Sequence, residues 1–164
     1  MQICVLGKLH VQRLYGCEFE QMRKNKDILY IVIPAYNESE NIESLINDWY
    51  PIIDKHNANG KSRLAIINDG SSDNTLERLK GMANERPLLS IISKENGGHG
   101  SAVLCGYRYA IENKADWVFQ TDSDGQTNPN EFEGFWGLRN RYDAIIGNRP
   151  DRGDGWFSLN FRVN

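Results

Sequence analysis

The chain of 164 residues lacks any apolar run approaching the ~20 residues of a membrane span, and no signal peptide with its small-residue cleavage site is evident at the start. These absences predict a soluble chain. Cysteine is also scarce, with only Cys4, Cys17 and Cys105 in the chain. An odd number of cysteines at scattered spacings fits neither a disulfide framework nor a zinc site. This cysteine usage favours a reducing, cytoplasmic setting.

A large excess of one charge sign is lacking as well. Lys and Arg total 19 against 22 Asp and Glu, which gives a formal net charge of -3. No basic block is dense enough to form a nucleic-acid footprint, so we expect no nucleic-acid partner. The length fits one domain with enough mass to bury a hydrophobic core.

The first 27 residues lack a clear hydrophobic period and end in a basic cluster, Arg23 to Lys26. We therefore treat residues 1–27 as an N-terminal extension of uncertain order. Within it, Ile3 to Leu6 is a candidate short strand and His10 to Tyr15 a candidate helical turn. The domain is expected to occupy residues 28–164.

From Ile28 onward, apolar runs typical of buried strands alternate with segments whose apolar residues recur at helical spacing. Asn37, with Glu40 three residues later, predicts a helix start, and Pro51 is expected to bend or close that helix. The alternation predicts right-handed βαβ crossovers and an α/β fold, with a mainly parallel sheet and helices on both faces. Strands are expected at 28–33, 64–67, 88–92, 115–120 and 142–146, and helices around Ile42 to Trp49, Leu76 to Ala83, 102–111 and 131–138.

Unusual polar clusters follow three of the expected strands, at Pro34 to Glu38, Asn68 to Gly70 and Asp122 to Gln126. The carboxyl ends of parallel strands share one edge of a sheet, and ligands of such sheets bind there. The sequence therefore predicts a functional site to which these loops contribute together.

The glycine motifs of two common nucleotide-binding folds are absent from the first expected strand, where neither G-x-G-x-x-G nor G-x-x-x-x-G-K-[ST] occurs. A glycine-rich stretch, Asn96 to Gly100, comes later and lacks a P-loop lysine in register. Its glycines either let the backbone approach a ligand closely or form a flexible start to a helix, and the sequence leaves both open.

The turn at Asp122, Asp124 and Gln126 can aim two carboxylates and an amide at one hard cation, which prefers oxygen ligands and can neutralise a diphosphate. A calcium loop of the EF-hand kind does not fit, because Thr127 stands where a glycine is needed and Pro129 falls inside the loop. A phosphatase loop of the haloacid dehalogenase kind fits poorly, since that loop follows the first strand. A turn that merely ends a strand remains an alternative.

Four motifs resemble family-2 glycosyltransferases in order and spacing: Ile31 to Glu38, Asn68 to Asp73, Asn96 to Gly98, and Asp122 to Asp124. The resemblance spans about Tyr30 to Arg162 and implies a GT-A nucleotide-sugar-binding fold and an inverting hexosyltransferase. The turn at residues 122–126 and the later Gly147-Asn148-Arg149 look most like the polyprenyl-phosphate branch, which includes dolichol-phosphate mannosyltransferases and implies a role in cell-envelope polysaccharide synthesis.

The resemblance also implies roles for individual residues. Purely structural roles remain as alternatives. Tyr36 could pack its loop, Asp69 could stabilise its turn, and the two arginines could be solvated surface charges. The implied catalytic residues are Asp122, Asp124 and Arg149; the nucleotide-sugar-binding residues are Pro34, Tyr36, Glu38, Asp69, Gly97, Asp122 and Arg152; and the ligands of Mg²⁺ or Mn²⁺ are Asp122, Asp124 and Gln126.

By this resemblance the donor is a UDP- or GDP-linked sugar and the acceptor a polyprenyl phosphate, which is already anionic and needs little help from a general base. Two alternatives remain: a catalytically incomplete nucleotide-sugar-binding module, and a transferase that acts on a saccharide hydroxyl. The resemblance implies that the domain is truncated at its C-terminal side, with a membrane-embedded partner or a missing C-terminal region, and that the full-length protein sits at the cytoplasmic face of a membrane.

Overall fold

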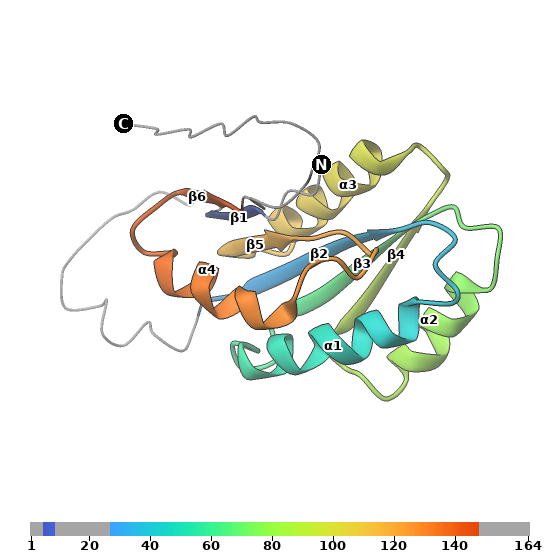
Figure 1. The fold of residues 1–164 in the computed structure, drawn as a ribbon, viewed down its shortest axis with the longest axis horizontal. Helices are drawn as coiled ribbons and strands as arrows, with labels where there is room; N and C mark the ends of the chain where they lie inside the picture. Colours follow the sequence, from blue (N-terminus) through green and yellow to red (C-terminus); the bar gives the residue numbers. More distant parts are fainter. Residues whose placement is uncertain (1–4, 9–26, 148–164) are drawn as a thin grey trace.

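The computed structural model describes residues 5–8 and 27–147, whose strands form a six-stranded sheet in the order β4-β3-β2-β5-β1-β6 (Figure 1). Strands β2, β3, β4 and β5 run parallel, and β1 is antiparallel to both of its neighbours, β5 and β6. The predicted mainly parallel sheet is thus confirmed. The strands are β1 (Val5–Lys8), β2 (Leu29–Ala35), β3 (Arg63–Asp69), β4 (Leu89–Lys94), β5 (Trp117–Gln120) and β6 (Ala144–Ile146).

The central strand β2 is buried along its whole length. Its side chains alternate: Leu29, Ile31 and Ile33 belong to the core on one face of the sheet, and Tyr30 and Val32 to the core on the other. A strand covered on both faces explains the continuous apolar run in the sequence.

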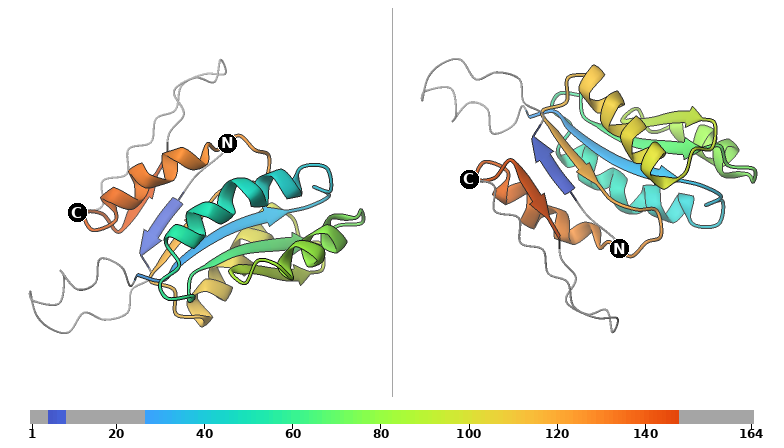
Figure 2. Two further views of the ribbon diagram at one scale, coloured as in Figure 1. Left: turned by 90° about the horizontal axis from the view of Figure 1, so that it is seen from below. Right: turned by 90° about the horizontal axis from the view of Figure 1, so that it is seen from above.

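Helices cover both faces of the sheet, as predicted. Figure 2 shows α1 and α4 in front of the sheet in one view and α3 in front in the opposite view. Leu79 of α2 belongs to the same core as the buried residues of α1 and α4, whereas Ala102 and Ala110 of α3 belong to the other. The helices are α1 (Ile42–Lys55), α2 (Thr75–Ala83), α3 (His99–Glu112) and α4 (Phe132–Leu138), with a 3₁₀ turn at Pro129–Glu131.

The predicted helix start at Asn37 is wrong. Helix α1 begins at Ile42, and Asn37 instead has a left-handed φ of 54° and accepts a hydrogen bond from another loop. Pro51 does not close the helix, which continues to Lys55. Because Ile53 beyond the proline is fully buried, packing of the last turn compensates for the missing backbone donor.

Strand β1 comes from the region that we treated as an extension, and it forms two residues later than the candidate strand at Ile3 to Leu6. It lies between β5 and β6 in the same sheet as the rest of the fold. The candidate helical turn at His10 to Tyr15 lies outside the described residues, and the domain boundary at residue 27 stays a prediction. No helix in the described part of the chain combines the length and the apolar character needed to cross a membrane.

Candidate functional site

A cavity of about 360 Å³ lies at the carboxyl ends of the parallel strands. It is lined by Asp69, the last residue of β3, and by residues of the loops that follow β2, β4 and β5. The predicted meeting of strand ends at one edge of the sheet is therefore confirmed for residues 27–147. The lining residues of the cavity are Pro34, Ala35, Tyr36, Glu38, Asp69, Asn96, Gly98, His99, Ala102 and Ser123.

The loops after β2 and β3 are joined by hydrogen bonds in both directions. The Asn37 amide donates to the Ser71 hydroxyl at 3.0 Å, and the Ser72 amide donates to Asn37 Oδ1 at 2.9 Å. The Glu38 amide also donates to Thr75 Oγ1 at 2.9 Å. These contacts fix the backbone of the loop that carries Tyr36, whose side chain is about half exposed beside the cavity.

Asp73 holds the same two loops together, although the sequence did not single it out. Its Oδ1 accepts hydrogen bonds from the hydroxyl and the amide of Thr75, and its Oδ2 accepts one from the Ser39 amide at 3.1 Å. The Thr75 hydroxyl, acting against desolvation and helped by the Thr75 amide and by Ser39, lowers the pKa of Asp73 to about 2. Asp73 is therefore an ionised anchor of the loops rather than a cavity residue.

Asp69, at the end of β3, is buried and lines the cavity. Its Oδ1 accepts hydrogen bonds from Lys94 Nζ and, at 3.0 Å, from the Gly97 amide. Burial opposes ionisation of this carboxyl, but the hydrogen bonds and the charge of Lys94 together hold its pKa below the usual range. The predicted residues Asp69 and Gly97 thus contact each other, and Lys94 joins them.

Asp122 follows β5 and is partly buried beside the cavity. Its Oδ1 accepts a hydrogen bond from Gln120 Nε2 at 3.0 Å and lies 3.6 Å from Nε2 of the exposed His99. Burial, with the nearby charge of Asp124, raises the pKa of Asp122 above its usual value despite the opposing effects of His99 and Gln120. His99 therefore lies next to the predicted site residue Asp122. The glycine-rich sequence around His99 did not indicate this position.

Asp124 and Gln126 are exposed, and the Gln126 amide donates to Asp124 Oδ1 at 3.0 Å within the turn. Among residues 27–147, no cluster of three or more His, Cys, Asp or Glu side chains is arranged to hold a metal. Mg²⁺ does not need such a cluster, since it commonly uses one or two carboxylates together with substrate phosphates and water. The oxygen donors of the turn fit this mode, and a cation would relieve the repulsion between Asp122 and Asp124.

Residues 30–163 match the sequence model of glycosyl transferase family 2. The chain belongs to this family. The segments Ile31 to Glu38, Asn68 to Asp73 and Asp122 to Asp124 lie within the matched residues, and each contributes residues to the cavity at one edge of the sheet.

Curated relatives in the family include polyprenyl-phosphate enzymes. The chain is 31% identical over 142 residues to the undecaprenyl-phosphate 4-deoxy-4-formamido-L-arabinose transferase of Proteus mirabilis, covering 85% of this chain and 41% of the relative. It is 30% identical over 117 residues to the UDP-N-acetylglucosamine–dolichyl-phosphate N-acetylglucosaminyltransferase of Methanococcus voltae, covering 63% and 44%. The chain thus spans less than half the length of these relatives.

The fold of this family-2 chain is similar to that of a solved structure, S. aureus TarS 1-349. The TM-score is 0.54 at 19% identity, with 70% of this chain and 32% of TarS covered. At this identity the likeness concerns the fold alone, and it confirms the predicted GT-A architecture.

Two predicted phosphate-binding residues, Arg149 and Arg152, lie outside the described residues. The described chain ends at Gly147, just after β6. Their assignment therefore stays a prediction from the family motif, together with the catalytic role of Arg149.

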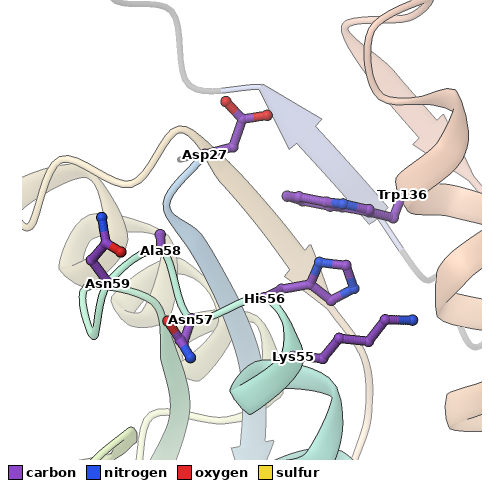
Figure 3. Close-up of a pocket in the computed structure, with 7 residues that line it drawn as sticks. All are labelled: Asp27, Lys55, His56, Asn57, Ala58, Asn59 and Trp136. Atoms are coloured by element: carbon purple, nitrogen blue, oxygen red, sulfur yellow. The ribbon is translucent and has the colours of Figure 1, made fainter. Parts of the chain in front are cut away.

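A second cavity, of about 260 Å³, lies near the amino ends of β2 and β3, at the edge of the sheet opposite the first cavity (Figure 3). Its ionic groups are paired across elements: Glu133 of α4 lies 2.7 Å from Lys55 and 3.0 Å from His56, and Asp27 lies 3.0 Å from Arg139. These pairs join α1 and β2 to α4. The cavity contains no predicted site residue and is lined by Asp27, Lys55, His56, Asn57, Ala58, Asn59 and Trp136.

Proposed function

We propose that this chain binds a UDP- or GDP-linked sugar and transfers the sugar, with inversion of its anomeric centre, to a polyprenyl phosphate. The observation that carries the proposal is the cavity at the carboxyl ends of the strands, which holds Pro34, Tyr36, Glu38 and Asp69 beside Asp122. Membership of glycosyl transferase family 2 supports the reaction class. Two relatives named as transferases to undecaprenyl and dolichyl phosphate support the acceptor class.

The nucleoside part of the donor would occupy the cavity. Tyr36 offers an aromatic face that is about half exposed, and Pro34 offers an apolar edge. Asp69 would accept a hydrogen bond from the base, and the Gly97 amide already holds Oδ1 of this carboxylate in place. Because the loop of Tyr36 and Glu38 is pinned to the loop of Ser71 and Ser72, little ordering would be needed on binding.

Asp122, Asp124 and Gln126 would hold Mg²⁺ or Mn²⁺ together with the donor diphosphate. The bound cation would supply charge neutralisation for the departing nucleoside diphosphate. Asp122 is held by the hydrogen bond from Gln120, whereas Asp124 is exposed to solvent.

In the reaction, an oxygen of the acceptor phosphate forms a bond to the anomeric carbon while the bond from that carbon to the nucleoside diphosphate breaks. The acceptor is an anion, so no side chain has to remove a proton from it. Arg149 and Arg152 are proposed as phosphate partners because a guanidinium stays charged and can form two parallel hydrogen bonds to a phosphate. A lipid acceptor would place the full-length protein at a membrane surface.

The test of the donor site is a titration of the chain with UDP-sugars and GDP-mannose in the presence of Mn²⁺. We expect metal-dependent binding of at least one donor, weakened at least roughly tenfold by Asp124→Ala. Asp48→Ala, which removes an exposed carboxylate from α1, should bind as the unmodified chain does. Absence of metal-dependent binding to any donor would refute the proposal.

The test of the acceptor is transfer of a radiolabelled sugar from the bound donor to dolichyl or undecaprenyl phosphate in membranes. Transfer to the lipid phosphate supports the proposed reaction, and transfer to a saccharide hydroxyl would replace it with the alternative acceptor class. Donor binding without any turnover would favour a nucleotide-sugar-binding module.

A further inference from the structure

A hydrogen bond between two buried threonines closes the acidic turn, residues 122–126, at its base. Thr121 Oγ1 donates to Thr127 Oγ1 at 2.8 Å. Thr121 is fully buried and Thr127 is 7% exposed, whereas the residues of the turn between them are half-buried or exposed. Neither threonine lines the cavity, and neither is a proposed ligand of the cation. We call these two residues the threonine pair.

The fold holds both members of the threonine pair in place. The Thr121 amide donates to the carbonyl oxygen of Val32 at 3.2 Å, just beyond the paired residues of β5 and β2. On the other side of the turn, Phe132 begins α4 and packs edge-to-face on Phe119 of β5, with ring centroids 5.1 Å apart. The acidic turn therefore connects two points that the core keeps fixed.

The tip of the acidic turn is not held by packing. In the described part of the chain, no atom lies within 4 Å of a Cβ added at Gly125, which has a φ of +69°. The charges of Asp122 and Asp124 also repel each other. Mg²⁺ demands near-ideal geometry, so a turn that can spread apart binds it less tightly than one whose ends are closed. A buried hydroxyl pair supplies this closure without adding a charge to the site.

We propose that Thr121 and Thr127 are positioning residues of the metal site: their hydrogen bond closes the acidic turn, so that its carboxylates face one cation before the cation binds. The inference rests on the proposed function and deepens it, because it adds two residues that act through the turn and touch neither the cation nor the nucleotide. The threonine pair reduces the ordering that cation binding requires, so its loss weakens the metal-dependent part of donor binding.

The test is a titration of Mn²⁺ into the chain in the presence of excess UDP or GDP. Thr121→Val and Thr127→Val remove a hydroxyl and keep the branched shape. Each should weaken Mn²⁺ binding by roughly three- to tenfold, the effect of one net hydrogen bond. Thr127→Ser keeps the hydroxyl and should bind Mn²⁺ as the unmodified chain does. The double valine variant should bind no more weakly than the weaker single variant, because both substitutions remove the same bond.

A second measurement separates positioning from a general loss of structure. UMP or GMP without metal should bind the valine variants as it binds the unmodified chain, because the loops after β2 and β3 lie outside the threonine pair. Ser62→Ala is the matched control, since its buried hydroxyl accepts a hydrogen bond of 3.0 Å from the Leu29 amide at the amino end of β2. This variant should lower the urea midpoint and leave the Mn²⁺ affinity unchanged. Thr127→Ala serves if the valine variants do not fold.

Three results would each overturn the inference while sparing the proposed function. They are an unchanged Mn²⁺ affinity in the valine variants, additive losses in the double variant, and equal weakening of metal-free and metal-dependent nucleotide binding. No metal-dependent nucleotide binding by the unmodified chain would overturn both the inference and the proposed function.

Discussion

The Ser123 hydroxyl donates a hydrogen bond of 2.9 Å to Glu38 Oε1, across 85 positions of the sequence. Both residues line the cavity, Glu38 from the loop after β2 and Ser123 from the turn after β5. The bond therefore connects the proposed nucleoside side of the site to the turn of Asp122 and Asp124. Ser123 stands between the two carboxylates in the sequence, where the motif itself leaves the residue type open.

Replacing Ser123→Ala should weaken donor-nucleotide binding by a few-fold, corresponding to the roughly 0.5–1.5 kcal/mol of one hydrogen bond. The reason is that the acidic turn loses its tie to Glu38, so more of its ordering has to occur on binding. The measurement is the dissociation constant of UDP or GDP with Mn²⁺. Ser44→Ala, an exposed position on α1, is the control, and equal affinities for the two variants would contradict the prediction.

Gly70→Ala should impair nucleotide binding because Gly70 supports the glycine loop. It has a φ of +67°, and a Cβ there would lie 2.6 Å from the Asn96 backbone nitrogen. The matched control is Gly60→Ala, because Gly60 also has a positive φ, of +78°, but open space around the added Cβ. Both variants should lose the roughly 1–2 kcal/mol of stability that a left-handed alanine costs.

Only the Gly70 variant should also lose nucleotide affinity, since moving Asn96 displaces the Gly97 amide that holds Asp69. Urea unfolding gives the stability of both variants, and titration with UDP or GDP gives their affinity. Similar nucleotide affinity in the Gly70 and Gly60 variants would show that the contact with Asn96 does not shape the site.

The parts of the site that sequence alone could predict are those that depend on strand direction. Pro34 and Asp69 lie at the carboxyl ends of parallel strands, and Tyr36 and Glu38 come shortly after one of these ends. Parallel strands end at one edge of the sheet, so the meeting of these residues in one cavity was predictable. The hydrogen bond from Lys94 to Asp69 was not predictable, because it depends on the register between β3 and β4, which no local pattern specifies.

Helix ends were harder to predict for a similar reason. Asn37 has the residue type and spacing of a helix cap, yet its side chain accepts a hydrogen bond from the Ser72 amide in another loop. A contact between loops therefore overrode the local preference. Of the two effects expected at Pro51, a bend or the end of the helix, the end does not occur there, because the burial of Ile53 beyond it is a tertiary effect.

The stability of the fold should depend on pH through Asp73. Its pKa is lowered to about 2 in the folded chain, against ~3.9 in an unfolded chain. The stabilisation is therefore fully present above about pH 4 and is lost as the pH falls toward 2. We expect Asp73→Asn to lower the urea midpoint at pH 6 and to differ less from the unmodified chain at pH 2.5.

Asp48→Asn, which changes an exposed carboxylate on α1, is the control for the general effect of removing one acid. Its difference from the unmodified chain should change less with pH than that of Asp73→Asn. A constant difference between Asp73→Asn and the unmodified chain from pH 6 to 2.5 would contradict the assigned role of Asp73.

Gly106→Ala should destabilise the fold by about 1–2 kcal/mol, because the added methyl overpacks the contact of α3 with the sheet. A Cβ at Gly106 would lie 2.2 Å from Val32 Cγ1 and 3.2 Å from Ile67 Cγ1, and both residues are fully buried. Val32 is branched at Cβ and cannot rotate away easily, so the helix has to move outward. The measurement is the free energy of unfolding in urea.

Gly81→Ala in α2 is the matched control, since no atom lies within 4 Å of the added Cβ. This variant should gain up to roughly 1 kcal/mol, the difference in helix propensity between alanine and glycine. The same propensity gain acts at Gly106, so the gap between the two variants measures the steric cost of bringing α3 close to β2 and β3. Equal stabilisation of both variants would contradict the prediction. It would show that the close approach at Gly106 does not set the position of α3, and of the glycine loop before it, over the sheet.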